Sequence, residues 1–104
     1  MVSELAARVA ADPDALRALC QRHHVRTLSL FGSVLREDFR PDSDVDVLVE
    51  FEPGHVPGYF RFADIGFKLE ELFGRKVDLH TPQSLSRHFR EDVVRAAEPL
   101  YGST

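Results

Sequence analysis

The segment DVDVLVEF, which begins at Asp44, limits the fold more than any other part of the chain. Side chains of a strand alternate between its two faces, so Asp44 and Asp46 would share one face, and Val45, Val47 and Val49 the other. Valine favours strands and buried positions, whereas a carboxylate is costly to bury without a positive partner. The segment therefore predicts a strand with one buried face and one acidic face.

A second segment, KVDLHT, repeats this pattern around Asp78. Val77 and Leu79 would face the core and Asp78 would emerge on the opposite side. If the two strands are neighbours, Asp44, Asp46 and Asp78 converge, and three carboxylates repel one another unless a cation lies between them. Oxygen ligands with open coordination positions favour Mg²⁺ or Mn²⁺ over zinc. We therefore expect these three aspartates to bind magnesium, with manganese as a substitute.

Gly32 and Ser33 directly follow a predicted strand, VRTLSLF, and precede a predicted helical turn. Glycine lets a phosphate approach the backbone closely, while the serine hydroxyl and a helix N-terminus offer hydrogen-bond donors. Arg36, one turn after Ser33, is placed to reach a phosphate bound there, and Arg40 is a weaker candidate. A phosphate-binding turn is thus expected beside the acidic strand.

The remaining elements follow from helical spacing of apolar residues. Such spacing occurs at about residues 13–23, from Phe62 to Phe73, in the tail from Phe89 to Leu100, and in a short stretch at 1–11. Gly74 stands where a left-handed helix cap is expected. We expect the tail helix to pack one face on the core. The order of elements predicts an α+β fold, a small mixed sheet with helices covering one face.

Length and composition exclude several classes of protein. The 104 residues fit one domain, residues 1–104, with the motifs in about 25–101. A net charge of -4 argues against a general nucleic-acid coat protein, so nucleic acid is not expected as a partner. No apolar run approaches the ~20 residues that span a bilayer, and the single Cys20 cannot form an internal disulfide. We expect a cytoplasmic protein that does not bind membranes.

The histidines are not assigned to the site. His80 shares the face of Asp78, but a carboxylate metal centre does not need it, and we expect a satisfied or solvent-facing imidazole. His23 and His24 are adjacent, so on a helix they would point apart. One cysteine and the lack of His-x₃-His spacing make a zinc site an unfavoured interpretation. Asp42 precedes the acidic strand and is expected to serve the turn.

Taken together, these residues resemble the DNA polymerase β-like nucleotidyltransferase superfamily. Gly32-Ser33, ten intervening residues and Asp44-Val45-Asp46 match its signature. The segments PDSDVDVLVEF, ELFGRKVDLHTP and VVRAAEPLYG resemble its shortest branch. That branch comprises the minimal nucleotidyltransferases, which are often encoded beside a HEPN-domain partner and act as antitoxins in prokaryotic HEPN/MNT modules.

The resemblance implies that Asp44, Asp46 and Asp78 are the catalytic ligands of two Mg²⁺ ions, and that Ser33 contacts the triphosphate of ATP. It further implies that AMP is transferred to a tyrosine of the HEPN partner, which is thereby silenced. Two alternatives stay open. The acceptor could be a small molecule such as an aminoglycoside, or a nucleic-acid end, although no added acceptor-binding domain is evident. The chain could also be a non-catalytic module that neutralises its partner by contact, which the complete set of aspartates disfavours.

Overall fold

The computed structural model describes residues 12–35 and 44–102. The elements in chain order are α2 (Pro13–Arg22), β1 (Val25–Phe31), the 3₁₀ helix η1 (Gly32–Leu35), β2 (Val45–Phe51), α3 (Tyr59–Phe73), β3 (Val77–His80), the 3₁₀ helix η2 (Pro82–Ser84), α4 (Arg87–Ala96) and β4 (Glu98–Tyr101). The helix expected at 1–11, together with Arg36, Arg40 and Asp42, lies outside the described residues. Within the described part, no helix is long and apolar enough to cross a membrane.

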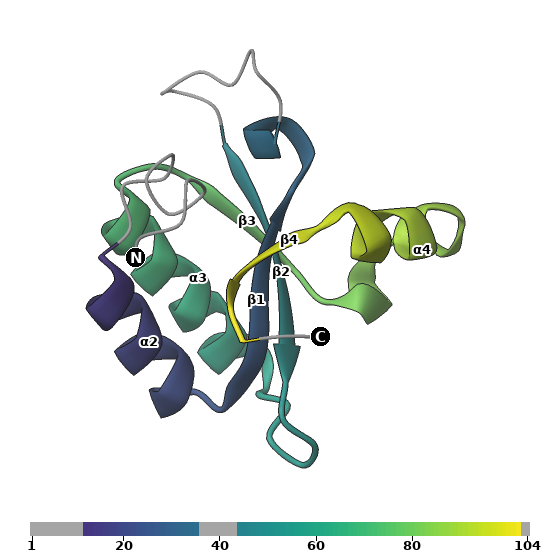
Figure 1. Cartoon of the computed structure of the whole chain (residues 1–104). Coiled ribbons are helices and arrows are strands. Elements are labelled where there is room, and N and C mark those ends of the chain that lie inside the picture. Colours follow the sequence, from purple (N-terminus) through teal and green to yellow (C-terminus); the bar gives the residue numbers. More distant parts are fainter. Residues whose placement is uncertain (1–11, 36–43, 103–104) are drawn as a thin grey trace.

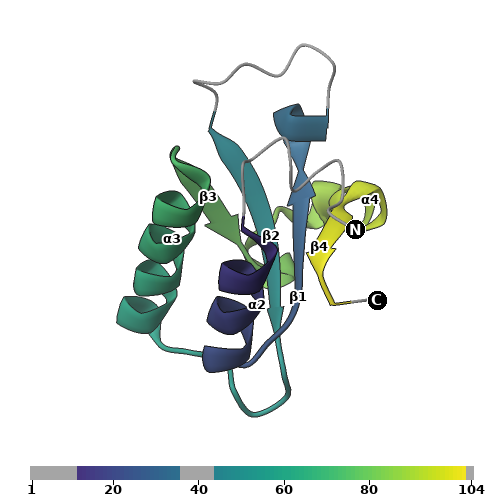
Figure 2. The ribbon, with the colours of Figure 1, turned by 60° about the vertical axis from the view of Figure 1, so that its left-hand side comes forward.

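The four strands form one mixed sheet in the order β3-β2-β1-β4. β1 pairs antiparallel with both β2 and β4, and β2 pairs parallel with β3. The parallel pair is possible because α3 carries the chain back from the end of β2 to the start of β3. Figures 1 and 2 show α2 and α3 side by side on one face of this sheet. The predicted α+β fold with a mixed sheet is confirmed.

The core lies between the sheet and these two helices. Val45, Val47 and Val49 are fully buried, as the alternation predicts, and they pack with Ile65 and Leu69 of α3. A core of this kind contributes most of the stability of a small domain, because burial of each methylene is worth about 0.8 kcal/mol. The acidic face of β2 therefore points away from α2 and α3.

Both core helices begin and end at capping residues. Pro13 opens α2, and the Asp12 side chain accepts a hydrogen bond from the Asp14 amide at 3.0 Å. Gly74 closes α3 in the left-handed region with φ of 69°, as its position in the sequence predicts. Helix α3 begins at Tyr59, three residues before the predicted Phe62. The periodicity missed this first turn because its aromatic side chains are exposed.

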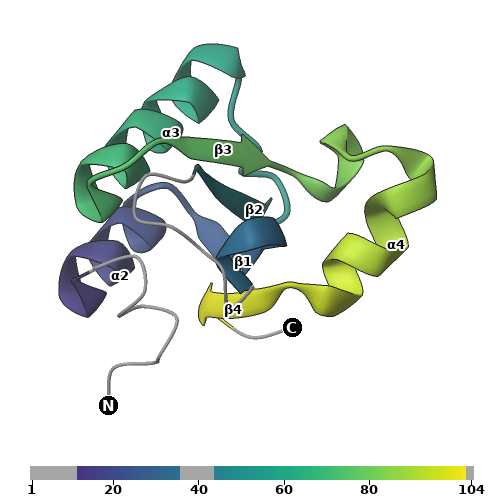
Figure 3. The ribbon, with the colours of Figure 1, turned by 90° about the horizontal axis from the view of Figure 1, so that it is seen from above.

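The tail differs from the prediction. The helix ends before Glu98–Tyr101, which instead form β4 against β1. No residue of α4, all of which are described, is buried, and Phe89 is 62% exposed, so the expectation that the tail helix packs on the core was wrong. Arg90 attaches α4 to η2 by donating to the carbonyl of Pro82 at 2.7 Å. As Figure 3 shows, α4 lies on the side of the sheet away from α2 and α3.

Candidate active site

The acidic side chains of β2 and β3 meet in register. Asp46 pairs with Asp78, and Val45 pairs with Val77, in the parallel ladder. Register partners point to the same face of a sheet, so both carboxylates lie on the face opposite the buried Val45 and Val47. The prediction that these two strands are neighbours is confirmed.

Gly32 lies against Asp46 from the other side. Phe31, the last residue of β1, is the register partner of Asp46, and Gly32 follows it with φ of 77°. A Cβ built at Gly32 would overlap the Asp46 Oδ2 atom and lie 3.3 Å from its Cγ. Glycine is required here both by the left-handed backbone and by the carboxylate. The turn between β1 and η1 therefore presents its backbone directly beside Asp46.

The electrostatics of Asp46 show that the acidic groups surround it. Burial raises the pKa of the half-buried Asp46, and the negative charges of Asp78 and Asp44 raise it further, while His80 acts in the opposite direction. Each of these acidic contributions makes the ionised carboxylate costly. A bound cation would reverse them, so the donor set, three carboxylates and no sulfur, fits a hard divalent ion.

The oxygens of the three carboxylates do not form a tight cluster. Among the described residues, Asp44, Asp46 and Asp78 do not form a group whose oxygens all lie within 4.8 Å of one another. Asp44 and Asp78 are exposed, whereas Asp46 is fixed by its contact with Gly32. Because the Asp44 and Asp78 side chains are exposed, they can rotate toward a common ion. Mutual repulsion between like charges favours the wider arrangement.

Comparison with known proteins gives the family. The nucleotidyltransferase domain family matches residues 13–99. The protein adenylyltransferase MntA of Thermococcus cleftensis is 38% identical over 79 residues, which cover 76% of this chain and 78% of that protein. The chain belongs to the nucleotidyltransferase domain family.

Solved structures agree with this family. A protein assigned as a minimal nucleotidyltransferase superposes with a TM-score of 0.71 at 38% identity, covering 94% of this chain and 97% of that one. A toxin-antitoxin structure with AMP-PNP superposes with a TM-score of 0.70, covering 89% and 75%, and its 21% identity shows the fold alone. The expected resemblance to minimal nucleotidyltransferases is confirmed, and so is the prediction that the protein is an enzyme of this class.

Other predicted residues of this nucleotidyltransferase are placed less completely. The backbone of Ser33 lies in η1, one residue after Gly32, and Arg36 lies outside the described residues. His80 is half-buried, and its ring meets that of Phe31 edge-on, with centroids 5.6 Å apart. Its charge lowers the pKa of Asp46, so the imidazole lies near that carboxylate. The sequence signal for this was its position two residues after Asp78, on the same face.

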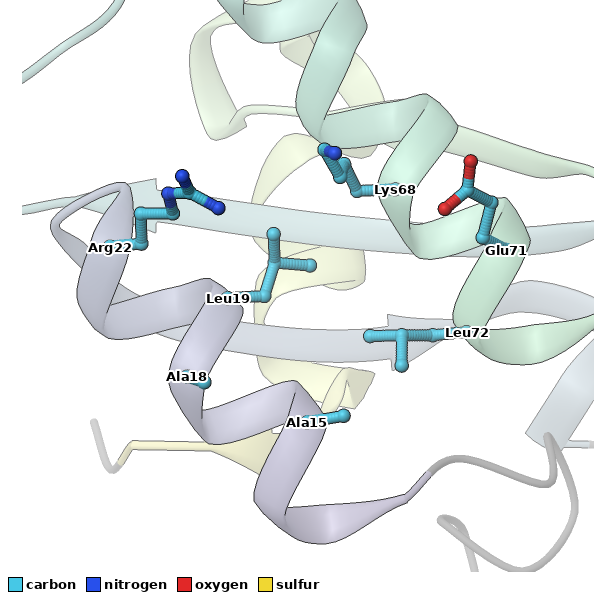
Figure 4. Close-up of a pocket in the computed structure, with 7 residues that line it drawn as sticks. All are labelled: Ala15, Ala18, Leu19, Arg22, Lys68, Glu71 and Leu72. Atoms are coloured by element: carbon cyan, nitrogen blue, oxygen red, sulfur yellow. The ribbon is translucent and has the colours of Figure 1, made fainter.

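The nucleotidyltransferase also has a hollow of about 400 Å³ between α2 and α3. Its lining, drawn in Figure 4, consists of Ala15, Ala18, Leu19, Arg22, Lys68, Glu71 and Leu72. These helices cover the buried face of the sheet, so the hollow is separated from the aspartates by the core. We assign it no part in catalysis.

Proposed function

We propose that this nucleotidyltransferase transfers AMP from ATP to a tyrosine hydroxyl of a HEPN-type toxin and so acts as its antitoxin. The observation that carries the proposal is the register of Asp46 with Asp78, together with the contact between Asp46 and Gly32. The names of similar proteins support a protein as the acceptor and an adenine nucleotide as the donor. One is a protein adenylyltransferase, and one structure of the same fold is a toxin-antitoxin complex with an ATP analogue.

In this proposal Asp44 and Asp46 would hold one ion that neutralises the triphosphate, and Asp78 would join Asp46 in holding a second that activates the incoming hydroxyl. When bound, magnesium or manganese would neutralise the phosphate charge and make the hydroxyl more acidic. Gly32 leaves the backbone open to a phosphate, and Ser33 and Arg36 are proposed to donate to the triphosphate. The tyrosine hydroxyl then gives its proton to water as its oxygen bonds to the α-phosphorus. The bond between that phosphorus and the α–β bridging oxygen breaks, and pyrophosphate leaves with the bridging oxygen.

The exposed aromatic residues of α3 support a protein as the acceptor. Tyr59 and Phe60 are 80% and 86% exposed, and Phe67, two turns later, is also exposed. Tyr59 and Phe67 line a hollow of about 280 Å³ beside the edge strand β3. Exposed apolar surface of this kind marks interaction sites in soluble domains. If the acceptor were a small molecule, this exposed apolar surface of α3 would have no explanation.

The test is transfer in a purified system. The chain, its proposed HEPN-type toxin, magnesium and ATP labelled at the α-phosphate should give a toxin whose mass rises by one AMP. Replacement of the acceptor tyrosine by phenylalanine and Asp78→Asn in the enzyme should each abolish labelling. Asp92→Asn, an exposed aspartate of α4, is the matched control and should label normally.

Two outcomes would favour the alternatives. Label that appears on an aminoglycoside or on a nucleic-acid end, but not on the toxin, would replace the proposed acceptor. If an enzyme carrying both Asp44→Asn and Asp46→Asn neutralised the toxin as well as the wild type, the chain would act by contact rather than by transfer.

A further inference from the structure

Three potential metal ligands gather at the end of the β1–β2 ladder opposite Gly32 and Asp46. The ligand atoms of His24, Glu52 and His55 all lie within 4.8 Å of one another, and all three side chains are exposed. Val25 pairs with Phe51 at this end of the ladder, which brings His24 opposite Glu52. The sequence alone does not reveal this cluster, because His24 lies 28 residues before Glu52.

The backbone fixes the three residues relative to one another. The Glu52 amide donates to the His24 carbonyl at 2.9 Å, and the His55 amide donates to the Glu52 carbonyl at 3.0 Å. The imidazole rings of His24 and His55 stack with centroids 3.9 Å apart and planes 20° from parallel. The ligands are therefore brought together by the fold and not only by side-chain motion. Pre-positioned ligands lower the ordering cost of binding.

The conformation of His24 is a second, independent observation. With φ of 57°, it is the one non-glycine residue of the described chain in the left-handed region. It stands just after the cap of α2, where glycine is the usual residue. Its neighbour His23 is only 8% exposed and accepts a hydrogen bond from Arg61, so the two imidazoles point apart, as predicted. Local backbone energetics favour glycine at position 24, and the exposed ring gains no burial there.

We propose that His24, Glu52 and His55 bind one divalent transition-metal ion of the zinc class. Two imidazoles and one carboxylate are ligands that such ions prefer, and they leave a coordination position open for water. Ligand atoms around zinc lie about 2.0–2.2 Å from the ion and so roughly 3.3 Å from one another. To complete the site, the two stacked, exposed imidazoles would turn out of their stacked arrangement so that one nitrogen of each faces the ion. The ion would tie the turn after β2 to the start of β1, next to the exposed aromatic residues of α3.

Calorimetric titration of zinc into the Asp44→Asn, Asp46→Asn variant tests the proposal, because this variant lacks two of the carboxylates that would compete with the imidazoles for zinc. We expect one zinc ion per chain. Glu52→Gln and His55→Ala should weaken binding at least ~10-fold, since even indirect changes at metal sites have effects of this size. His24→Gly should do the same while preserving the fold, because glycine adopts the left-handed conformation without strain. His88→Ala, at an exposed histidine of α4, is the control and should bind as wild type.

The place of the ion is tested with paramagnetic Co²⁺ by nuclear magnetic resonance. The amide signals of His24 and Glu52 should shift or broaden at the first equivalents, while the Asp46 signal stays sharp. Signals that change first at Asp46 would place the ion among the aspartates and overturn the proposal. Equal zinc affinity of the wild type and His24→Gly, or zinc binding only at millimolar concentration, would overturn it as well.

Discussion

The two ends of the β1–β2 ladder carry different chemistry on the same pair of strands. At one end Phe31 pairs with Asp46, and the side chains that gather there are carboxylates. At the other end Val25 pairs with Phe51, and two imidazoles join one carboxylate. Ion choice depends on ligand type, so the first end suits magnesium and the second suits zinc. In the two proposals, one pair of strands would hold two unlike sites at its opposite ends.

Each end of the ladder has a residue with positive φ, Gly32 at one and His24 at the other, and the two residues differ in the role of the side chain. Gly32 needs its conformation and its missing side chain, because Asp46 occupies the space where a Cβ would be. His24 takes the same backbone region with its side chain exposed. A glycine at such a position suggests that something must approach the backbone, whereas a histidine there suggests that the imidazole itself is used.

The largest effect should come from Asp46→Asn, which separates the two ends. Loss of an ion ligand should lower the rate of AMP transfer on the order of 10³-fold, because metal ions contribute several kcal/mol of transition-state stabilisation. Zinc affinity at His24 should stay within a factor of two or so of wild type, since the sites share no ligand. Single-turnover transfer and zinc titration of one preparation measure both. A parallel loss of zinc would mean that the ends are not independent.

A change in the shared core should affect both ends. Leu30 is fully buried, and its register partner on β2 is Val47. Leu30→Ala should lower the free energy of unfolding by about 2–5 kcal/mol, because it removes buried methyl groups and leaves a cavity. Denaturation by urea measures this. Val94→Ala, at an exposed position of α4, is the control and should change stability by no more than about 0.5 kcal/mol.

Magnesium should stabilise the carboxylate end in a pH-dependent way. The pKa of Asp46 is raised in the folded state, so without an ion Asp46 contributes more stability at low pH, and this is lost as pH rises through its folded pKa. Magnesium needs the ionised form, so its effect has the opposite sign. At a hundred times its dissociation constant it should add about 2.7 kcal/mol near neutral pH and progressively less as Asp46 protonates. Paired thermal melts across pH measure this, and an increment that grows toward acid pH would contradict it.

The carboxylate end could be predicted from the sequence because its signals are local. The alternation around Asp46 and Asp78 predicts which sheet face each carboxylate lies on. The pairing of β2 with β3 then brings the two carboxylates together. The histidine end could not, because His24 is 28 residues before Glu52 and no periodicity connects them. Only the pairing of Val25 with Phe51 brings them together.

The tail was mispredicted for a different physical reason. Its helical spacing is genuine, since α4 does form, but a helix held by Arg90 at η2 does not need to bury its apolar side chains. The helical spacing that runs on to Leu100 concealed β4, although Pro99 cannot continue a helix and fits a strand only at an edge, where β4 lies. Edge position is a property of the whole sheet and cannot be read from four residues.

Gly32→Ala tests whether the Asp46 site requires a residue without a side chain at position 32. The left-handed backbone should cost about 1–2 kcal/mol for alanine, and the overlap with Asp46 should displace the carboxylate and weaken magnesium binding. Gly54→Ala is the matched control. Its φ is 81°, but no described atom lies within 4 Å of a Cβ built there, so it should show the backbone cost alone. If both variants bound magnesium equally, the contact with Asp46 would have no functional consequence.

The smallest effect is expected at Cys20, the single cysteine of the chain, although a thiolate is a ligand that zinc prefers. Burial raises the pKa of its thiol to about 12, and Cys20 is only 1% exposed, so the thiolate that zinc needs is not available. Cys20→Ala should therefore leave zinc affinity unchanged within about a factor of two. If the thiolate bound zinc, the same substitution would lower zinc affinity strongly. Alkylation of the native thiol should be on the order of 10³-fold slower than in urea, because so little of it is ionised. If the thiol were alkylated rapidly and zinc prevented this reaction, Cys20 rather than His24 would be a ligand of the ion.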